Sequence, residues 1–315
     1  MQIILANPRG LCAGVIRAID IVNKLINKYK KKIYIKHEIV HNKFIVNKLK
    51  KKGVVFVEKI SNVPKGEIII FSAHGVSKKD KKEAKIKNLK IFDATCPLVL
   101  KIHSKVIQAS KKGTEIILIG HHGHPEVIGT IGQYTNNNAG IYLIQTIKDI
   151  KKLKIKNKQN LKFVTQTTLS VENTNFIVKE LKKKYPEIKN SNKNDICYAT
   201  TNRQKAVKIL SKKTDIVIVI GSRNSSNANR LAEIVHNLGN NVKLVDNEKD
   251  IKKSWFKNIK KIGITSGAST PEILVNQVIK KLFTFGIKDI KEIYGKKEEI
   301  SFKIPKKIDL VNLTI

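Results

Sequence analysis

Three cysteines lie at similar places in the 315-residue chain, and their thiols are suited to metal or redox chemistry. Cys12 occurs in GLCAGV, Cys96 in DATCPLV and Cys197 in DICYATT, each after a short apolar run and before a helical pattern. A thiol at a helix N-terminus has a lowered pKa, and the thiolate is the form that binds metals. Three thiolates could hold an iron–sulfur cluster or zinc with one position open, whereas inert core cysteines would explain the same spacing.

Two polar residues follow each cysteine at regular distances. The first comes 28 or 29 residues after the cysteine, and the second comes 33 to 44 residues later. The three pairs are His41 and His74, His124 and Thr167, and Ser225 and Ser269. One thiol and two polar side chains in each repeat predict three similar units around one shared site.

The segment GHHGHPEVIGT at residues 120–130 concentrates ionisable side chains in one loop after a predicted strand. His121, His122, His124 and Glu126 could together bind a metal ion. The loop could instead hydrogen-bond an anion, with Glu126 as a proton donor, or be a polar loop that caps a helix. The residues alone leave these interpretations open.

Four further loops combine Gly, Ser, Thr, Asn or His at the start of predicted helices. Such side chains, together with unpaired backbone N–H groups, can bind phosphate. They predict a phosphate-bearing small molecule bound by His74, Thr167, Thr168, Ser225, Ser226, Asn227 and Ser269. Thr270 is the expected cap of the next helix, whose first turn is expected to contain Pro271. The sequence contains neither a P-loop nor a GxGxxG motif, which disfavours a nucleotide.

The formal net charge of +37 could indicate binding to nucleic acid or to an anionic membrane. Five of the 62 basic residues are Arg, the residue best suited to bidentate phosphate and base contacts, and the others are Lys. We therefore interpret the charge as a compositional bias with solvated lysines, and expect neither a nucleic-acid nor a membrane partner. A basic surface would still attract an acidic protein.

The sequence also indicates a cytoplasmic location. No apolar run approaches the roughly 20 residues of a membrane span, and the N-terminal residues lack a signal-peptide pattern. An odd number of widely spaced cysteines is a poor disulfide framework and suits a reducing compartment.

Strand-like apolar runs alternate with helical periodicity along the chain. Strands are predicted at residues 2–6, 67–71, 115–119, 163–165, 215–220 and 261–265. Helix starts are predicted at Ser77, from the pattern Ser-x-x-Asp, and at Pro97. This alternation predicts an α/β fold with parallel sheets, in which ligands bind at the carboxyl ends of strands. The expected units are 1–96, 97–193 and 194–281, followed by a C-terminal tail at 282–315 that packs back on the fold.

Long motifs in a fixed order resemble one family. They are ANPRGLCAGVIRAI, HEIVHN, FSAHGVS, DATCPLV, IGHHGHPEVIGT, TQTTLS, DICYATTNRQ, GSRNSSNANRL and ITSGASTPE. On these motifs the chain is identified as a member of the 4-hydroxy-3-methylbut-2-enyl diphosphate reductase family, the last enzyme of the non-mevalonate isoprenoid pathway. The resemblance implies three α/β units in a pseudo-threefold trefoil arrangement around a central [4Fe–4S] cluster with an open apical iron.

The resemblance also implies a role for each matching residue. Cys12, Cys96 and Cys197 would be the cluster ligands. Glu126 would be the proton donor, and Thr167 and Thr168 would line the substrate site. The diphosphate would be bound by His41, His74, His124, Ser225, Ser226, Asn227 and Ser269.

The implied reaction is the reductive dehydroxylation of the allylic diphosphate to isopentenyl and dimethylallyl diphosphate. Electrons would come from an acidic carrier, a ferredoxin or flavodoxin, and a monomer is expected. Without the resemblance, the residues would also fit a zinc-dependent enzyme acting on phosphorylated metabolites. They would fit, in addition, a basic nucleic-acid-binding protein or an interaction protein with three core cysteines.

Overall fold

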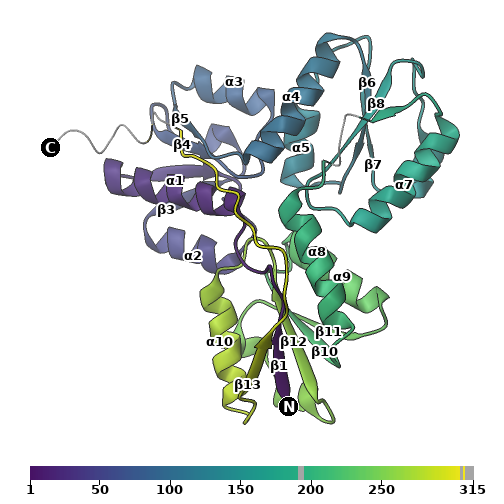
Figure 1. The fold of residues 1–315 in the computed structure, drawn as a ribbon. Helices are drawn as coiled ribbons and strands as arrows, with labels where there is room; N and C mark the ends of the chain where they lie inside the picture. Colours follow the sequence, from purple (N-terminus) through teal and green to yellow (C-terminus); the bar gives the residue numbers. More distant parts are fainter. Residues whose placement is uncertain (191–194, 306–307, 309–315) are drawn as a thin grey trace. The chain divides into compact units, whose positions relative to one another are not determined.

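The computed structural model describes residues 1–190, 195–305 and 308, and they form an α/β fold with three sheets (Figure 1). Every described strand pair is parallel. The predicted α/β class is therefore confirmed. The expected boundary between residues 193 and 194 lies outside the described residues.

One four-stranded sheet has the strand order β3-β2-β4-β5. Its strands are β2 (Ile33–Lys36), β3 (Val54–Val57), β4 (Ile68–Phe71) and β5 (Lys90–Asp93), and the accompanying helices are α1 (Ala13–Tyr29), α2 (Lys43–Lys51) and α3 (Lys78–Ile86). The central strand β4 is wholly apolar and buried, because a parallel strand is covered on both faces. Helix α3 begins after Ser77, whose side chain forms the predicted capping box with Asp80.

A second four-stranded sheet has the order β7-β6-β8-β9. Its strands are β6 (Glu115–Ile119), β7 (Ile141–Ile144), β8 (Leu161–Thr165) and β9 (Lys189–Asn190), and its helices are α4 (Pro97–Lys111), α5 (Pro125–Ile131), α6 (Ile147–Lys152) and α7 (Val171–Lys184). Pro97 is the first residue of α4, as predicted. Successive side chains of β6 point to opposite faces. Ile117 packs with Leu181 of α7, and Ile116 packs with Val106 of α4.

The third sheet has five strands in the order β11-β10-β12-β1-β13. They are β1 (Gln2–Leu5), β10 (Ile216–Ile220), β11 (Asn241–Val245), β12 (Lys261–Ser266) and β13 (Asp289–Glu292), with helices α8 (Tyr198–Ser211), α9 (Ser226–Asn237) and α10 (Glu272–Phe283). Helix α10 packs on one face of this sheet, and α8 and α9 pack on the other (Figure 1). Short 3-10 helices lie at Ile60–Asn62, Glu248–Asp250 and Lys253–Phe256.

The three sheets share one strand order, which confirms the prediction of three similar α/β units. We call β2, β6 and β10 the first strands, β3, β7 and β11 the second strands, and β4, β8 and β12 the third strands. In each sheet the first strand lies between the second and the third, and a fourth strand lies beyond the third. The N-terminal strand β1 takes this fourth place beside β12, so it lies among strands from the other end of the chain (Figure 1). The fourth strands β5, β9 and β1 precede Cys96, Cys197 and Cys12, respectively. Strand β13, from the expected C-terminal tail, pairs with β1.

The contacts within the chain define two compact bodies. The first body comprises Met1–Val15, His41–Ile45 and Tyr198–Ser301, and the second comprises Ile16–Val40, Val46–Cys197 and Phe302–Ile315. The first body holds the five-stranded sheet, and the second holds both four-stranded sheets. In the part of the chain that the structure describes, no helix is both long and apolar enough to cross a membrane.

Candidate functional site

The three cysteines occupy equivalent positions in the three sheets. The backbone N–H of Cys96 donates to the carbonyl of Ala73 at 3.0 Å, two residues beyond the end of β4. Cys197 N–H donates to the Thr167 carbonyl at 3.1 Å, two residues beyond β8. Cys12 N–H donates to the Ala268 carbonyl at 3.0 Å, two residues beyond β12. The same backbone hydrogen bond, from the cysteine after a fourth strand to the loop after a third strand, thus occurs three times.

The cysteines also have the local surroundings of metal ligands. Each of the three is partly exposed, and none of them forms a disulfide. Cys96 is the N-cap of α4, and Cys12 and Cys197 directly precede α1 and α8. Each sulfur atom therefore lies at the N-terminal end of a helix. Sulfur donors of this kind fit an iron–sulfur cluster. Within the first or second body, no described group of three or more His, Cys, Asp or Glu residues gathers closely enough to hold an ion.

Glu126 lies in surroundings that raise the pKa of its carboxyl group. It lies in the first turn of α5, and its side chain is only 3% exposed. Thr167 N–H donates to Glu126 Oε1 at 2.6 Å, and Thr167 Oγ1 donates to Oε2 at 2.7 Å. Burial raises the pKa of Glu126 to about 7, although both hydrogen bonds from Thr167 lower it. The carboxyl group can therefore hold and release a proton near neutral pH.

Two histidines lie at the start of α5, the helix that carries Glu126. His124 is the N-cap of α5, and its Nδ1 accepts the backbone N–H of Glu126 at 3.1 Å. The His74 ring meets the His124 ring edge-on, with 5.7 Å between the ring centroids. His122 is exposed, and its N–H donates to Gln145 Oε1. This geometry favours the hydrogen-bonding interpretation of the loop at 120–130 over a metal site.

The loop that carries His74 is tightly packed, which requires glycine at the next position. Gly75 has φ +79°, and a Cβ atom there would lie 2.6 Å from His103 Cε1. On the other side of the loop, a Cβ at Gly129 of α5 would lie 3.2 Å from the Gly75 carbonyl group. Gln133 Nε2 donates to the Val76 carbonyl at 2.8 Å. The loop is therefore held between α4 and α5, which fixes where His74 lies relative to Glu126.

Five of the remaining predicted residues, His41, Ser225, Ser226, Asn227 and Ser269, lie in the first body. Ser225 is the N-cap of α9, and its Oγ lies 3.5 Å from Ser269 Oγ. Ser269 Oγ donates to the His41 carbonyl at 2.9 Å. Asn227 is buried, and its Oδ1 accepts the N–H of Ala268 at 2.8 Å. Ser226 is the first residue of α9. In the second body, Thr168 Oγ1 accepts from Gln166 Nε2 at 2.9 Å.

The expectation that Thr270 caps the next helix is wrong. Helix α10 begins at Glu272 with Pro271 at the N-cap position. Thr270 is fully buried, and its Oγ1 donates to the Ile220 carbonyl at 2.9 Å, at the end of β10. A buried hydroxyl group needs a partner, and the strand end supplies one before the helix starts.

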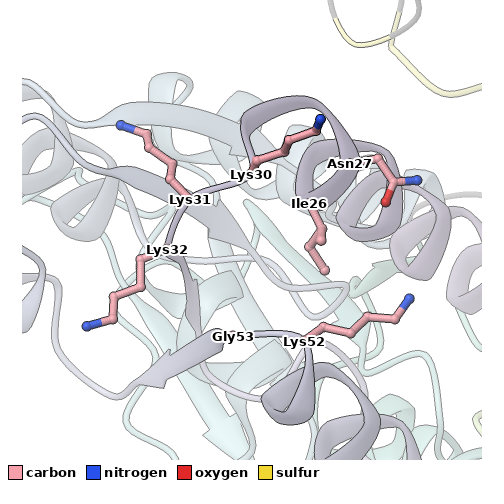
Figure 2. A pocket seen from close by; sticks show the side chains of 7 residues that line it. All are labelled: Ile26, Asn27, Lys30, Lys31, Lys32, Lys52 and Gly53. Atoms are coloured by element: carbon pink, nitrogen blue, oxygen red, sulfur yellow. The ribbon is translucent and has the colours of Figure 1, made fainter.

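Two cavities have linings that contain none of the predicted site residues. One, of about 550 Å³, is lined by Arg9, Arg203 and three glutamates, two of which pair with Arg9 and one with Arg203. The other, of about 650 Å³, lies where α1 and α2 end and is lined by Lys30, Lys31, Lys32 and Lys52. Figure 2 shows these lysine side chains pointing apart rather than toward one point. Neither cavity is lined by a residue that the sequence predicted as functional.

Comparison with known proteins agrees with the motifs. The model of the LytB protein family matches residues 3–283. The chain belongs to the LytB protein family. The resemblance inferred from the sequence motifs is thereby confirmed.

Similar proteins extend this family match over nearly the whole chain. The chain is 54% identical to a 4-hydroxy-3-methylbut-2-enyl diphosphate reductase of Histophilus somni, over 98% of each chain. It is 55% identical to the reductase of the same name from Baumannia cicadellinicola, over 99% of this chain and 100% of that one. The solved structure of the E-1-hydroxy-2-methyl-but-2-enyl-4-diphosphate reductase from Plasmodium falciparum is 39% identical, with a TM-score of 0.92 and coverage of 98% and 97%.

The structure also reveals residues of this LytB family member that the motif argument did not single out. Arg17, Arg203 and Lys105 contact the segments that lead into the cysteines, and His103 packs against the loop of His74. The sequence contained one signal that could have pointed to the two arginines. Arginine is rare in this lysine-rich chain, and two of its five arginines are buried.

Proposed function

We propose that this chain reductively dehydroxylates 4-hydroxy-3-methylbut-2-enyl diphosphate to isopentenyl and dimethylallyl diphosphate. The allylic C–O bond breaks, two electrons and two protons are taken up, and the hydroxyl group leaves as water. Family membership and the names of the near full-length relatives support this reaction. The observation that carries it is Thr167, which holds the Glu126 carboxyl group by its N–H and hydroxyl and accepts Cys197 N–H at its carbonyl. A proton donor is thus tied to a candidate metal ligand through one residue.

The proposed cofactor is a [4Fe–4S] cluster held by Cys12, Cys96 and Cys197, with the fourth iron open. Their equivalent hydrogen bonds and their positions at helix starts support this assignment. When bound, such a cluster supplies single electrons and a Lewis-acidic iron for the hydroxyl group. Three ligands rather than four leave a coordination position for substrate.

Hydrogen-bonding side chains bind the diphosphate in this proposal, namely His41, His74, His124, Ser225, Ser226, Asn227 and Ser269. Thr167 and Thr168 line the substrate site. Hydroxyl, amide and imidazole groups and the N-terminus of α9 are suitable partners for phosphate oxygens. Their role is to hold the allylic hydroxyl group in place for proton transfer.

Glu126 is the proton donor in this reaction, and Thr167 positions it. Burial raises the pKa of the carboxyl group to about 7, so part of the protein carries the proton at neutral pH and can donate it directly. The two hydrogen bonds from Thr167 orient both carboxyl oxygens.

Anaerobic purification followed by a turnover assay tests the function. We expect a brown protein that contains iron and sulfide and converts the allylic alcohol diphosphate to both products with a chemical reductant. A colourless protein with bound zinc and no turnover would instead support a zinc-dependent enzyme. A protein that binds neither metal would contradict both functions.

We further propose an acidic electron carrier, a ferredoxin or a flavodoxin, for a monomeric enzyme in the cytoplasm. The net charge of +37 would steer an acidic protein to the surface. Turnover with such a carrier should fall as ionic strength rises, because salt screens exposed charges beyond about 10 Å at 0.1 M. Turnover with an uncharged chemical reductant is the control, and it should change little. Equal salt dependence in the two assays would argue against charge steering.

A further inference from the structure

Three basic side chains each link the helix after one cysteine to the segment before another. Arg17 of α1, the helix after Cys12, donates from Nη1 to the Thr95 carbonyl at 3.1 Å. Thr95 directly precedes Cys96 in the chain. The link therefore runs from the helix that follows the first cysteine to the segment that enters the second.

The second link repeats this arrangement. Lys105 of α4, the helix after Cys96, pairs with Asp195 Oδ1 at 2.5 Å. Asp195 lies two residues before Cys197, and its Oδ2 accepts the N–H of Thr165 at the end of β8. The helix that follows the second cysteine is thus joined to the segment that enters the third.

The third link returns to the first cysteine. Arg203 of α8, the helix after Cys197, donates from Nη2 and Nε to the Gly10 carbonyl at 2.9 and 3.2 Å. Gly10 lies two residues before Cys12. Followed along the chain, the three contacts connect each cysteine to the next in a closed cycle.

Two of these cations are buried and the third is partly buried, unlike the solvated lysines expected at the surface. Arg17 is 7% exposed and Arg203 is 1% exposed, and the Lys105 side chain is 20% exposed beside a nearly buried Asp195. Removing a charge from water is unfavourable unless it gains specific partners. Arg203 also donates to the Ala199 carbonyl and pairs with Glu298, and Arg17 Nε donates to the Lys303 carbonyl. The two arginines are therefore held in place by several contacts each, and Lys105 is held by its pair with Asp195.

The three links differ in whether the cation pairs with a carboxylate. Lys105 and Arg203 each pair with a carboxylate, whereas the two described hydrogen bonds of Arg17 go to backbone carbonyls. Burial lowers the pKa of Arg17, and the negative charges of Asp93 and Cys96 raise it. Arginine stays protonated in either case. Arg17 thus brings a lasting positive charge to the Cys96 segment.

We propose that Arg17, Lys105 and Arg203 form a ring of positioning residues, which hold the segments before the three cysteines in place for cluster binding. Arg17, in addition, raises the reduction potential of the cluster. The proposal rests on the cluster assigned under the proposed function. Side chains that orient metal ligands through a second layer of hydrogen bonds commonly affect metal affinity by about 10- to 100-fold. A nearby positive charge favours the more negative, reduced form of a cluster.

The test measures cluster retention and reduction potential rather than turnover. The variants are Arg17→Gln, Arg17→Lys, Lys105→Met and Arg203→Lys, all purified anaerobically with the cluster. Arg230→Gln and Lys183→Met are the matched controls, because these cations pair with Glu233 and Glu180 on their own helices and contact no cysteine segment in the described contacts. Cluster loss is followed by absorbance during challenge with an iron chelator, and the potential by a mediated redox titration.

We expect each ring variant to lose its cluster about 10- to 100-fold faster than the wild type, and the controls to match the wild type within about twofold. Arg17→Gln should shift the potential to more negative values, whereas Arg17→Lys, which keeps the charge, should leave the potential near that of the wild type. Retention of the cluster at the control rate in all ring variants would overturn the positioning role. An unchanged potential in Arg17→Gln would overturn the charge effect.

Circular dichroism and thermal unfolding show whether a variant is folded before the challenge. If Arg17→Gln does not fold, the two Arg→Lys variants decide the positioning role, since they keep charge and much of the side-chain length. A wild-type protein without iron and sulfide would contradict the proposed function itself. If the wild type contains the cluster and the ring variants retain it at the control rate, only the proposed positioning role is contradicted.

Discussion

Replacing Glu126 with glutamine is expected to reduce turnover of the allylic diphosphate by about 100- to 10,000-fold, the usual contribution of a positioned acid or base. Glutamine has nearly the same shape but carries no acidic proton. Its carbonyl oxygen can still accept one hydrogen bond from Thr167, so the surrounding structure should persist. The measurement is anaerobic turnover with a chemical reductant, accompanied by iron and sulfide analysis.

Glu115→Gln is the matched control for this substitution. Glu115 is also a buried carboxyl group, and it accepts the backbone N–H groups of Lys156 and Asn157 at the other end of β6. Its replacement should lower stability, because hydrogen bonds to a charged group contribute about 1.5–3 kcal/mol. Turnover should stay within about twofold of the wild type if only proton transfer at Glu126 matters. Equal losses of turnover in both variants would show a structural effect instead.

The pH dependence of stability gives an independent measure of the proton on Glu126. Its pKa in the folded protein, about 7, lies above the ordinary value of 4.5. The folded state therefore holds this proton more tightly than the unfolded state, and its contribution to the free energy of unfolding should fall as pH rises between these values. Glu126→Gln should remove that part of the pH dependence. A wild-type and a variant protein with the same slope across this interval would argue against a raised pKa.

Replacing any one of the three cysteines with serine is expected to remove most of the iron and sulfide and to abolish measurable turnover. The loss should exceed the roughly 10- to 100-fold effect of residues that only orient ligands. Cys12, Cys96 and Cys197 should behave alike, because each is held by the same backbone hydrogen bond to the loop after a third strand. Metal analysis and visible absorbance of anaerobically purified variants measure the effect.

Alanine variants at the same positions separate ligation from packing. If the cysteines are only small core residues, alanine should be tolerated and the metal content should not change. If they are ligands, alanine and serine should both remove the cluster, whereas thermal unfolding of the metal-free proteins should be similar. Full iron content in a single-cysteine variant would show that this cysteine is not a ligand.

Much of the local structure was predictable, because it depends on residues within one strand or one helical turn. The strand predicted at 115–119 is β6 without change, and the capping box at Ser77 and the start of α4 at Pro97 were both predicted correctly. Strands β2, β3, β5, β7, β9, β11 and β13 were not predicted, since each is a run of five residues or fewer, and runs such as KIFD and NVKLV also contain polar residues. Thr270 was assigned to the helix after it, and its buried partner on β10 decided otherwise.

The sequence by itself determined the α/β class, the three equivalent cysteines and the polar loops that follow the strands, because each is written in a short run of residues. Only the tertiary structure decided that β1 completes the sheet of β10–β12 and that Thr167 joins Glu126 to Cys197. The tertiary structure also decided which residues Arg17, Lys105 and Arg203 contact, since these partners lie 78, 90 and 193 residues away in the chain. Such contacts leave no local pattern, since a buried polar group takes whichever partner the packed core brings to it.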